Sequence, residues 1–236
     1  VEASFPMNPD FNGETQEGAG FFQSTTRNGR RASSAFSYLR PAKRRSNLRV
    51  ETDALAQRLV FEGKRARAVD YRQRGRLHSA RARREILVSS GAYNSPQLLQ
   101  LSGIGPAEFL RSHGIEVVLD APGVGSDLQD HLQVRIVTRC PQAITLNDVV
   151  NNPVRRVLAG MQWAALRRGP LTLAAGTSGA FFKTSPRLAS PDIQIHFIPF
   201  STDKMGEKLH PFSGFTASVC QLRPESRGTL RIRSAD

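Results

Sequence analysis

The sequence predicts a mixed fold, with an α/β part in its first half and an α+β part in its second half. In the first half, a series of short β-rich runs ends at a strand-to-helix junction near residue 91, which is typical of α/β proteins. Beyond His131, one amphipathic helical pattern is followed by short alternating runs, which favours an antiparallel sheet.

The composition is that of a globular chain. Its 236 residues are 39% hydrophobic and 22% charged, which is enough to bury a core without disulfide bonds. Cys140 and Cys220 show no CxxC spacing and have no neighbouring Cys/His pair. We therefore expect two reduced thiols that pack as small apolar residues.

Both ends of the chain suggest a piece of a longer protein, because the sequence lacks an initiator Met and stops inside the alternating run RGTLRIRSAD. No run approaches the roughly 18 apolar residues of a membrane span. The N-terminus also lacks the basic and apolar regions of a signal peptide. The expected location is cytoplasmic, either free or peripheral at the inner membrane.

Residues 1–46 predict a loop, a hairpin and a short helix, in that order. Asn28-Gly29 is the strongest two-residue hairpin signal in the chain. Ser33 or Ser34 can cap the helix ASSAFSYL, which we expect to end before Pro41.

The next segment predicts strands. NLRVETDALAQRLVFEGKRARAVDYR indicates three short strands with a turn at Glu62-Gly63. RREILVSSG indicates a fourth strand that ends on Gly91, and its apolar run ILVSS suits burial on both faces of a parallel sheet.

The junction after this fourth run is the most informative local feature. We expect Gly91-Ala92 to turn the chain, Ser95 to cap the helix SPQLLQLSG, Pro96 to open it and Gly103 to follow its end. Small residues there would let a ligand approach the backbone at the positive end of the helix dipole. A tight turn without any ligand fits the same residues equally well.

The second half predicts a helix and a sheet. NNPVRRVLAGMQWAALRRG is an amphipathic helix that begins at Pro153. The strands of the expected antiparallel sheet are SGAFFKT, DIQIHFIPF, FTASVCQL and, after the turn PESRG, GTLRIRS.

The net charge of +13 raises the possibility of an anionic partner such as nucleic acid. Of the 33 basic residues, 28 are arginines spread along the chain, as an Arg-rich genome would produce. The densest run, Arg58 to Arg84, alternates like the solvated face of strands. We expect no nucleic-acid partner, and a basic nucleic-acid-binding module stays the alternative.

No glycine pair qualifies as a dinucleotide fingerprint. Gly103-Ile-Gly105 and Gly123-Val-Gly125 have Glu108 and Leu128 where the third small residue is required. Both pairs are therefore interpreted as helix ends and loops.

The five histidines show no metal-ligand spacing, so no metal is expected. Asp130-His131 has the residue types of an acid–base pair, but a structural role is favoured because neighbours on a strand point to opposite faces. For His196, a core histidine with its hydrogen bonds satisfied is favoured over a residue that lines a cavity.

The run GAYNSPQLLQLSGIG, residues 91–105, resembles the second signature of the glucose-methanol-choline (GMC) flavin oxidoreductases. Further segments, in this order, resemble the choline-dehydrogenase-like branch of that family: NGRRASSAFSYLRPAKRRSNLRV, LVFEGKRARAV, HGIEVVLDAPGVGSDLQDHLQ and PESRGTLRIRS. One departure is Asp127, where the family usually has Asn.

The resemblance implies a partial Rossmann-like FAD-binding domain and a substrate domain built on an antiparallel sheet. Residues 1–46 would lead into the FAD domain, residues 47–137 would form part of it, and residues 138–236 would form part of the substrate domain. The implied cofactor contacts are Ala56, Ser90, Gly91, Ala92 and Tyr93.

The resemblance also implies an activity, the FAD-dependent oxidation of a small alcohol, with hydride transfer to flavin N5 and an external electron acceptor or oxygen. Choline is one candidate substrate. The family's pyrophosphate loop would precede Val1 and its catalytic histidine would follow Asp236, so no catalytic residue is assigned. An incomplete, inactive fragment that binds no flavin is the other alternative.

Overall fold

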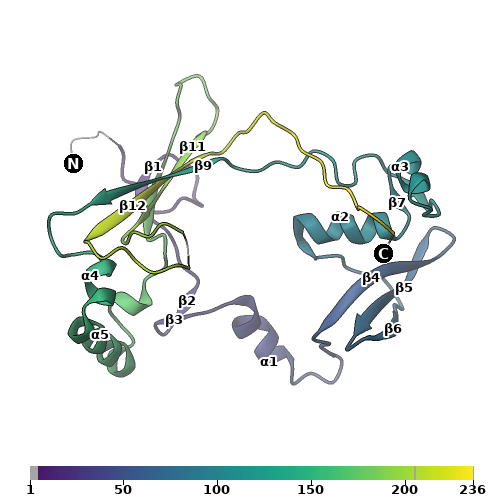
Figure 1. Ribbon diagram of the computed structural model, residues 1–236, viewed down its shortest axis with the longest axis horizontal. Coiled ribbons are helices and arrows are strands. Elements are labelled where there is room, and N and C mark those ends of the chain that lie inside the picture. Colours follow the sequence, from purple (N-terminus) through teal and green to yellow (C-terminus); the bar gives the residue numbers. More distant parts are fainter. Residues whose placement is uncertain (1–4, 205, 236) are drawn as a thin grey trace. The chain divides into compact units, whose positions relative to one another are not determined.

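The computed structural model describes residues 5–204 and 206–235. The chain forms two compact units, and both are discontinuous in sequence. Unit 1 comprises Val1–Arg45 and His131–Pro224, and unit 2 comprises Ser46–Asp130 and Glu225–Asp236. Figure 1 shows the elements of each unit along the chain.

Unit 1 is built on a five-stranded sheet in the order β1-β10-β11-β12-β9, in which every neighbouring pair is antiparallel. This confirms the antiparallel sheet expected for the second half. The strands are β1 Gly18–Phe21, β9 Gln133–Arg139, β10 Ser178–Phe182, β11 Ile193–Ile198 and β12 Gly214–Gln221. Along β12, buried and half-buried residues alternate, because successive side chains point to opposite faces.

The hairpin at Asn28-Gly29 forms as expected. It joins β2 Thr26–Arg27 to β3 Arg30–Arg31, and both turn residues have positive φ, 51° and 62°. Such a pair is what a two-residue hairpin of type I′ requires. The hairpin lies against the end of a helix: Trp163 Nε1 donates a hydrogen bond to the Gly29 carbonyl at 2.8 Å.

The helix after this hairpin runs past Pro41 and does not end before it. It consists of a π-helical stretch, η1 Ala35–Leu39, followed by α1 Arg40–Ala42. In an α-helix a proline ring collides with the carbonyl four residues earlier. The wider π-helical turn in front of Pro41 relieves that collision, so the chain stays helical.

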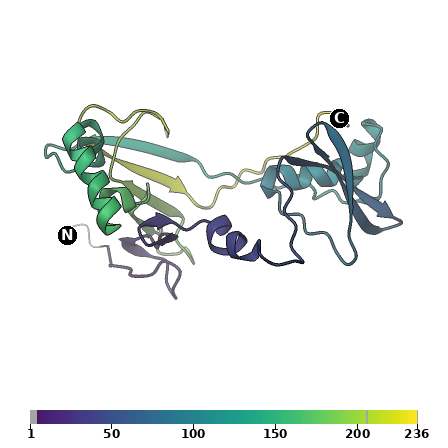
Figure 2. The same cartoon turned by 90° about the horizontal axis from the view of Figure 1, so that it is seen from below.

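Two further helices of unit 1 lie side by side, α4 Leu146–Asn151 and α5 Pro153–Leu166. The predicted start at Pro153 is correct, and the Asn152 side chain accepts hydrogen bonds from two backbone N–H groups of the first turn of α5. At the start of α4, burial opposes ionisation of Asp148. Hydrogen bonds from Ser213 and Thr145 outweigh this burial and lower the pKa of that carboxyl. Figure 2 shows α5 in green, followed by the short η2 Pro170–Thr172.

Unit 2 contains a three-stranded antiparallel meander, β4 Ala54–Glu62, β5 Arg65–Gln73 and β6 Arg76–Arg81. Two helices, α2 Gly91–Leu101 and α3 Ala107–Ser112, and a short parallel pair, β7 Ile104–Gly105 with β8 Leu119–Asp120, complete it. The turn at Gly63 forms at the predicted position, but the run 47–72 contains two strands and not the expected three, because residues 47–53 form no strand and β6 lies beyond the run. Figure 1 shows α2 next to β4, and the two elements are in contact.

The predicted strand ILVSS is wrong: residues 86–90 have no regular secondary structure and pair with no strand among the described residues. Leu87 is 81% exposed. A parallel strand depends on neighbours on both sides. The apolar pattern alone therefore does not make this run a strand here.

The helix that follows also begins earlier than expected, at Gly91 with Ser90 as its N-cap. Pro96 consequently lies inside α2 and does not open it. The Ser95 hydroxyl accepts a hydrogen bond from the Ser90 N–H at 3.1 Å, so it serves the preceding turn instead of capping the helix. Gly103 follows the end of the helix with φ of 85°, as predicted.

The last predicted strand, GTLRIRS, is also not a strand. Residues 225–235 return to unit 2, where Gly228 forms a single bridge with Leu128. Gln100, which is fully buried, holds this segment: its side chain bonds to the Leu230 carbonyl and to the Ile232 N–H, both at 3.0 Å. In this alternating run, backbone groups of Leu230 and Ile232 bond to the side chain of Gln100 in α2 and not to a neighbouring strand.

Candidate functional site

All five residues expected to contact the cofactor lie in unit 2. Ala56 is an exposed residue of β4 that pairs with Tyr71 of β5, and the ladder shifts register between Ala56 and Arg58. Ser90 is the N-cap of α2, and Gly91, Ala92 and Tyr93 form its first turn.

The backbone of the first turn of α2 is exposed. No side chain caps this helix end, and Tyr93 is 62% exposed. Gly91 has φ of 85°, and a Cβ atom built on it would meet no atom within 4 Å. The first N–H groups of an eleven-residue helix therefore face open space, where the helix dipole favours a negative group.

The two segments are connected by the packing of α2 on β4. The Ser102 hydroxyl at the end of α2 accepts a hydrogen bond from the Leu59 N–H of β4 at 2.8 Å. Leu59 and Leu98 are buried in the same contact, 6% and 7% exposed. The family resemblance implies that these two segments contact one ligand, and their elements, α2 and β4, pack together within unit 2. A role of the five residues in binding stays a prediction.

Unit 1 contains a separate groove of about 810 Å³. It lies among the hairpin β2–β3, α5 and the segment after η2, and its walls include Phe22, Thr25, Arg30, Trp163, Leu171 and Gly176. No sequence pattern indicates this groove, because its walls come from segments more than a hundred residues apart.

His196 of β11 stands beside this groove. Its ring lies 5.4 Å from the ring of Phe22, and a Cβ atom built on Gly176 would lie 3.8 Å from its Cδ2. Its buried Nδ1 has no hydrogen-bond partner among the described residues, and burial lowers the pKa of the imidazole. The expected core histidine with satisfied hydrogen bonds is therefore wrong.

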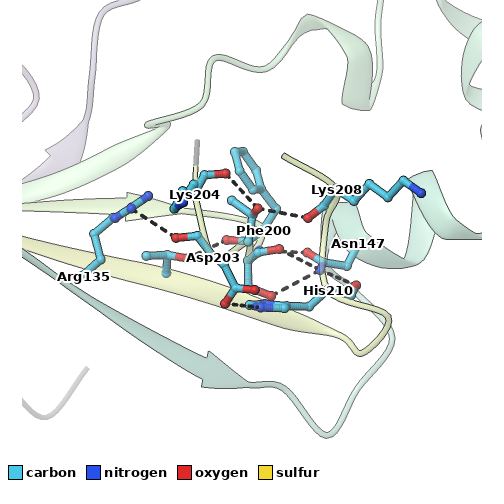
Figure 3. A network of polar contacts seen from close by, with 10 residues as sticks. Arg135, Asn147, Phe200, Asp203, Lys204, Lys208 and His210 are labelled. Carbon is cyan, nitrogen blue, oxygen red and sulfur yellow. Dashed lines mark hydrogen bonds and ion pairs between the residues drawn. The ribbon is translucent and has the colours of Figure 1, made fainter. Parts of the chain in front are cut away.

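A second polar cluster in unit 1 was missed by the sequence analysis (Figure 3). The Asn147 amide of α4 bonds to the N–H, carbonyl and hydroxyl of Ser201 and to the His210 carbonyl. His210 Nε2 lies 3.1 Å from a carboxylate oxygen of Asp203. These contacts attach the chain that follows β11 to α4, which is a structural role.

The remaining candidates of the sequence are the Asp130-His131 pair and the two cysteines. Asp130 and His131 fall on either side of the boundary between the two units. Cys140 and Cys220 form no disulfide bond among the described residues. Within the described part of the chain, no group of three or more His, Cys, Asp or Glu residues has the arrangement of a metal site. No helix in that part combines the length and apolar character needed to cross a membrane.

Comparison with known proteins decides the family. The model of the GMC oxidoreductase family matches residues 2–133, which is more than half of the chain. The chain belongs to the GMC oxidoreductase family. The resemblance found in residues 91–105 is thereby confirmed by an independent match that includes β4, α2 and the segment between them.

Curated relatives of this GMC oxidoreductase extend the match to its whole length. It is 43% identical over 235 residues to the oxygen-dependent choline dehydrogenase of Brucella anthropi, and the match covers 100% of this chain and 42% of that protein. It is 41% identical over 235 residues to the mitochondrial choline dehydrogenase of Homo sapiens, of which it covers 39%. The chain thus spans about two fifths of the length of these relatives.

Solved structures confirm the fold. A formate oxidase of Aspergillus oryzae superposes with a TM-score of 0.85 over 98% of this chain and 45% of that one, at 22% identity. A pyridoxine 4-oxidase from Mesorbium loti gives a TM-score of 0.77 over 98% of this chain and 42% of that one, at 24% identity. The mixed fold of this chain is therefore shared with these two oxidases.

Proposed function

We propose that this chain forms part of an FAD-dependent alcohol oxidoreductase, in which unit 2 contributes to FAD binding and unit 1 to the substrate side. The observation that carries the proposal is 43% identity over 235 residues, both units included, to an oxygen-dependent choline dehydrogenase. A nucleic-acid module does not account for identity to this relative across both units, whereas the inactive fragment is distinguished only by a measurement of flavin binding.

The residues of unit 2 fit a dinucleotide. The open space over Gly91 lets a phosphate or ribose approach the backbone, and the uncapped N–H groups of α2 offer hydrogen bonds to an anion. Ala56 is exposed, so its backbone edge is accessible beside a register shift in the strand ladder. When bound, FAD supplies the hydride acceptor at N5.

The groove of unit 1 is the candidate for the alcohol. It combines aromatic and aliphatic walls with hydroxyl groups of threonine, which is the usual composition of a small-molecule site. His196 beside it keeps Nδ1 without a partner among the described residues, so this nitrogen is available to a polar ligand. No catalytic residue of this chain is assigned, and the electron acceptor, an external acceptor or oxygen, stays open.

Titration of the chain with FAD tests the proposal. We expect saturable binding, seen as quenching of flavin fluorescence. Ala92→Glu should weaken binding at least about tenfold, because the added carboxylate would face the phosphates at the helix N-terminus. A glutamate in a first helical turn is favourable for folding, so this variant should stay folded.

The matched control is Ala80→Glu, which places the same charge on an exposed residue of β6 in the same unit. Equal affinity in the wild-type chain and the Ala92→Glu variant would contradict the assignment of α2. A chain that binds no flavin at millimolar concentration would favour the inactive fragment. Retention of duplex DNA that falls steeply with salt would instead favour the nucleic-acid module.

The cytoplasmic location also stays a proposal, as does its variant at the inner membrane. The exposed apolar side chains of α5, which include Val154 and Val157, lie near Arg155 and Arg156. An amphipathic helix of this kind is suited to a membrane surface, and equally to a protein partner. Sedimentation of the chain with anionic and with neutral vesicles would distinguish a helix that binds a membrane surface from one that binds a protein partner.

A further inference from the structure

A second recess in unit 1 adjoins the groove and shares Arg30 with it. Its volume is about 460 Å³. We call it the arginine recess, and its lining residues are Arg27, Asn28, Arg30, Phe36 and Arg167. Three of the five lining residues are arginines, so the recess has a strong positive charge.

The three arginines of the recess have no carboxylate partner in the described part of the chain. No residue that lines the recess is acidic. Arg167 Nη1 is buried and has no hydrogen-bond partner among the described residues. Guanidinium groups that converge without a counter-charge repel one another, and each offers a planar pair of donors that matches a carboxylate or a phosphate.

The same surroundings are unfavourable for a quaternary ammonium ion. Such a cation needs a free aromatic face or a carboxylate. The ring of Trp163 already carries the guanidinium of Arg167 at 4.4 Å and that of Arg30 at 5.5 Å. Among the described residues that line the groove, none is acidic.

Other aromatic rings near the sheet are also engaged by neighbouring rings. Phe181 is 6% exposed and packs against Phe11 with ring centroids 4.9 Å apart. Phe197 packs against Phe215 at 5.2 Å. These rings belong to ring pairs of the sheet, so they do not supply the aromatic cage that choline would require.

We infer that the groove and the arginine recess together bind a small organic anion. Its carboxylate or phosphate lies among Arg27, Arg30 and Arg167, and its apolar or hydroxylated body lies along Trp163 and Leu171. A quaternary ammonium molecule of the same shape is disfavoured. As a binding site the inference depends on unit 1 alone, whereas as the substrate class of the oxidoreductase it rests on the proposed function.

A structural explanation competes with this inference. The recess lies at the end of α5, where the carbonyl end of the helix dipole attracts cations. If that attraction alone holds the arginines in place, an added anion gains little binding free energy from them. No saturable binding is then expected. Binding measurements therefore distinguish the two explanations.

The test uses Trp163, the single tryptophan of the chain, as a reporter in the wall of the groove. Four small molecules that each contain one quaternary centre are titrated at constant ionic strength: 3-hydroxy-2,2-dimethylpropanoate, neopentyl phosphate, the neutral 3,3-dimethylbutan-1-ol and choline. Calorimetry runs in parallel, so that a silent fluorescence signal still gives a result. No flavin is added, so failure of FAD binding leaves the outcome unaffected.

We expect at least one of the two anions to bind at least tenfold more tightly than choline, with the neutral alcohol between them. Arg27→Gln should lower the affinity for that anion about tenfold, because Arg27 lines the recess without contacting Trp163. The matched control, Arg187→Gln, removes an equally exposed arginine of unit 1 outside both cavities and should change nothing.

Choline that binds as tightly as both anions would overturn the inference. So would the absence of saturable anion binding by both methods, or an equal loss of affinity in the Arg27 and Arg187 variants. Preference for the phosphate over the carboxylate, or the reverse, would identify which head group the recess accepts. Far-UV circular dichroism confirms that the variants are folded.

Discussion

Asn147 shows how one side chain holds two segments of unit 1 together. It is 1% exposed and makes hydrogen bonds to Ser201, which is fully buried, and to the His210 carbonyl. Asn147→Ala leaves the Ser201 N–H without a partner in the interior. We expect the free energy of unfolding to fall by about 2–4 kcal/mol in urea denaturation, since several buried polar groups lose their partners together.

The control for this substitution is one turn further along α4. Asn151 donates to the same His210 carbonyl at 2.8 Å but is exposed. Asn151→Ala should therefore cost less than about 0.5 kcal/mol. Similar losses in the two variants would show that burial of Asn147 is not what makes its hydrogen bonds matter.

His196 gives a prediction about pH. Burial lowers the pKa of its imidazole from the ordinary 6.5, so the folded state stays neutral at pH values where the unfolded chain binds a proton. Stability is fully present above pH 6.5 and is lost as the pH falls from 6.5 through the lowered pKa of the folded state. In His196→Phe, the decrease in unfolding free energy between pH 7.5 and 5.5 should be smaller than in the wild type.

Urea unfolding followed by Trp163 emission measures this difference, because that tryptophan reports on unit 1. Each variant is compared with its own value at pH 7.5, which removes the direct effect of the substitution on packing. The same pH dependence in both proteins would show that His196 does not contribute to it.

At the scale of elements, the β2–β3 hairpin depends on Gly29 for two reasons. Its φ is 62°, and a Cβ atom there would lie 2.3 Å from the Arg167 carbonyl oxygen. Gly29→Ala should cost about 1–2 kcal/mol for the left-handed backbone and a further 1–3 kcal/mol, roughly, for the collision. The hairpin would then separate from α5, and the emission of Trp163 should shift to the red as its N–H becomes hydrated.

Gly63 is the matched control, because its φ is 59° and a Cβ atom built on it would meet no atom within 4 Å. Gly63→Ala should cost only the backbone contribution and leave the Trp163 emission unchanged. An unchanged emission in Gly29→Ala as well would mean that the hairpin tolerates the extra methyl group.

The turns that depend on a few neighbouring residues were predicted correctly. Asn28-Gly29 and the turn at Gly63 place positive-φ residues between runs of strand-forming residues, and this signal is contained in a few neighbouring positions. Pro41 and Pro96 were taken as helix boundaries, yet both lie within helices. A proline restricts the chain locally, but the preceding turn can adjust to it, and that adjustment has no sequence signal.

At the scale of the whole molecule, charge is the dominant property. With 33 basic and 20 acidic side chains, at least 13 cations cannot pair one-to-one with a carboxylate. We expect sodium chloride to stabilise the chain by screening this repulsion. Between 20 and 300 mM salt the melting temperature should rise by about 2–4 °C, which corresponds to roughly 1 kcal/mol.

Differential scanning calorimetry measures this shift, with an isosmotic sucrose series as the control for effects unrelated to charge. A melting temperature that falls with salt would mean that ion pairs such as Arg58–Asp70 outweigh the excess of positive charge.

Long-range pairing explains most of what the sequence did not predict. β1 pairs with β10, which follows it by more than 150 residues, and the pattern GTLRIRS is completed by Gln100 and not by a neighbouring strand. The candidate FAD contacts came from a family resemblance in two segments, around Ala56 and residues 90–93, and they stay a prediction. The groove and the arginine recess are formed by residues 22–36 together with residues 163–176. No local sequence pattern predicts that these distant segments lie together.

The return of residues 225–235 to unit 2 has a consequence for synthesis of the chain. Gln100 finds its carbonyl and N–H partners at Leu230 and Ile232, which leave the ribosome only after all of the second segment of unit 1. At about 5–20 residues per second, the nascent first segment of unit 2 waits roughly 5–30 s for them. During that interval the Gln100 amide lacks these partners and the segment is open to chaperones, so slower translation over residues 131–224 should lengthen this exposure.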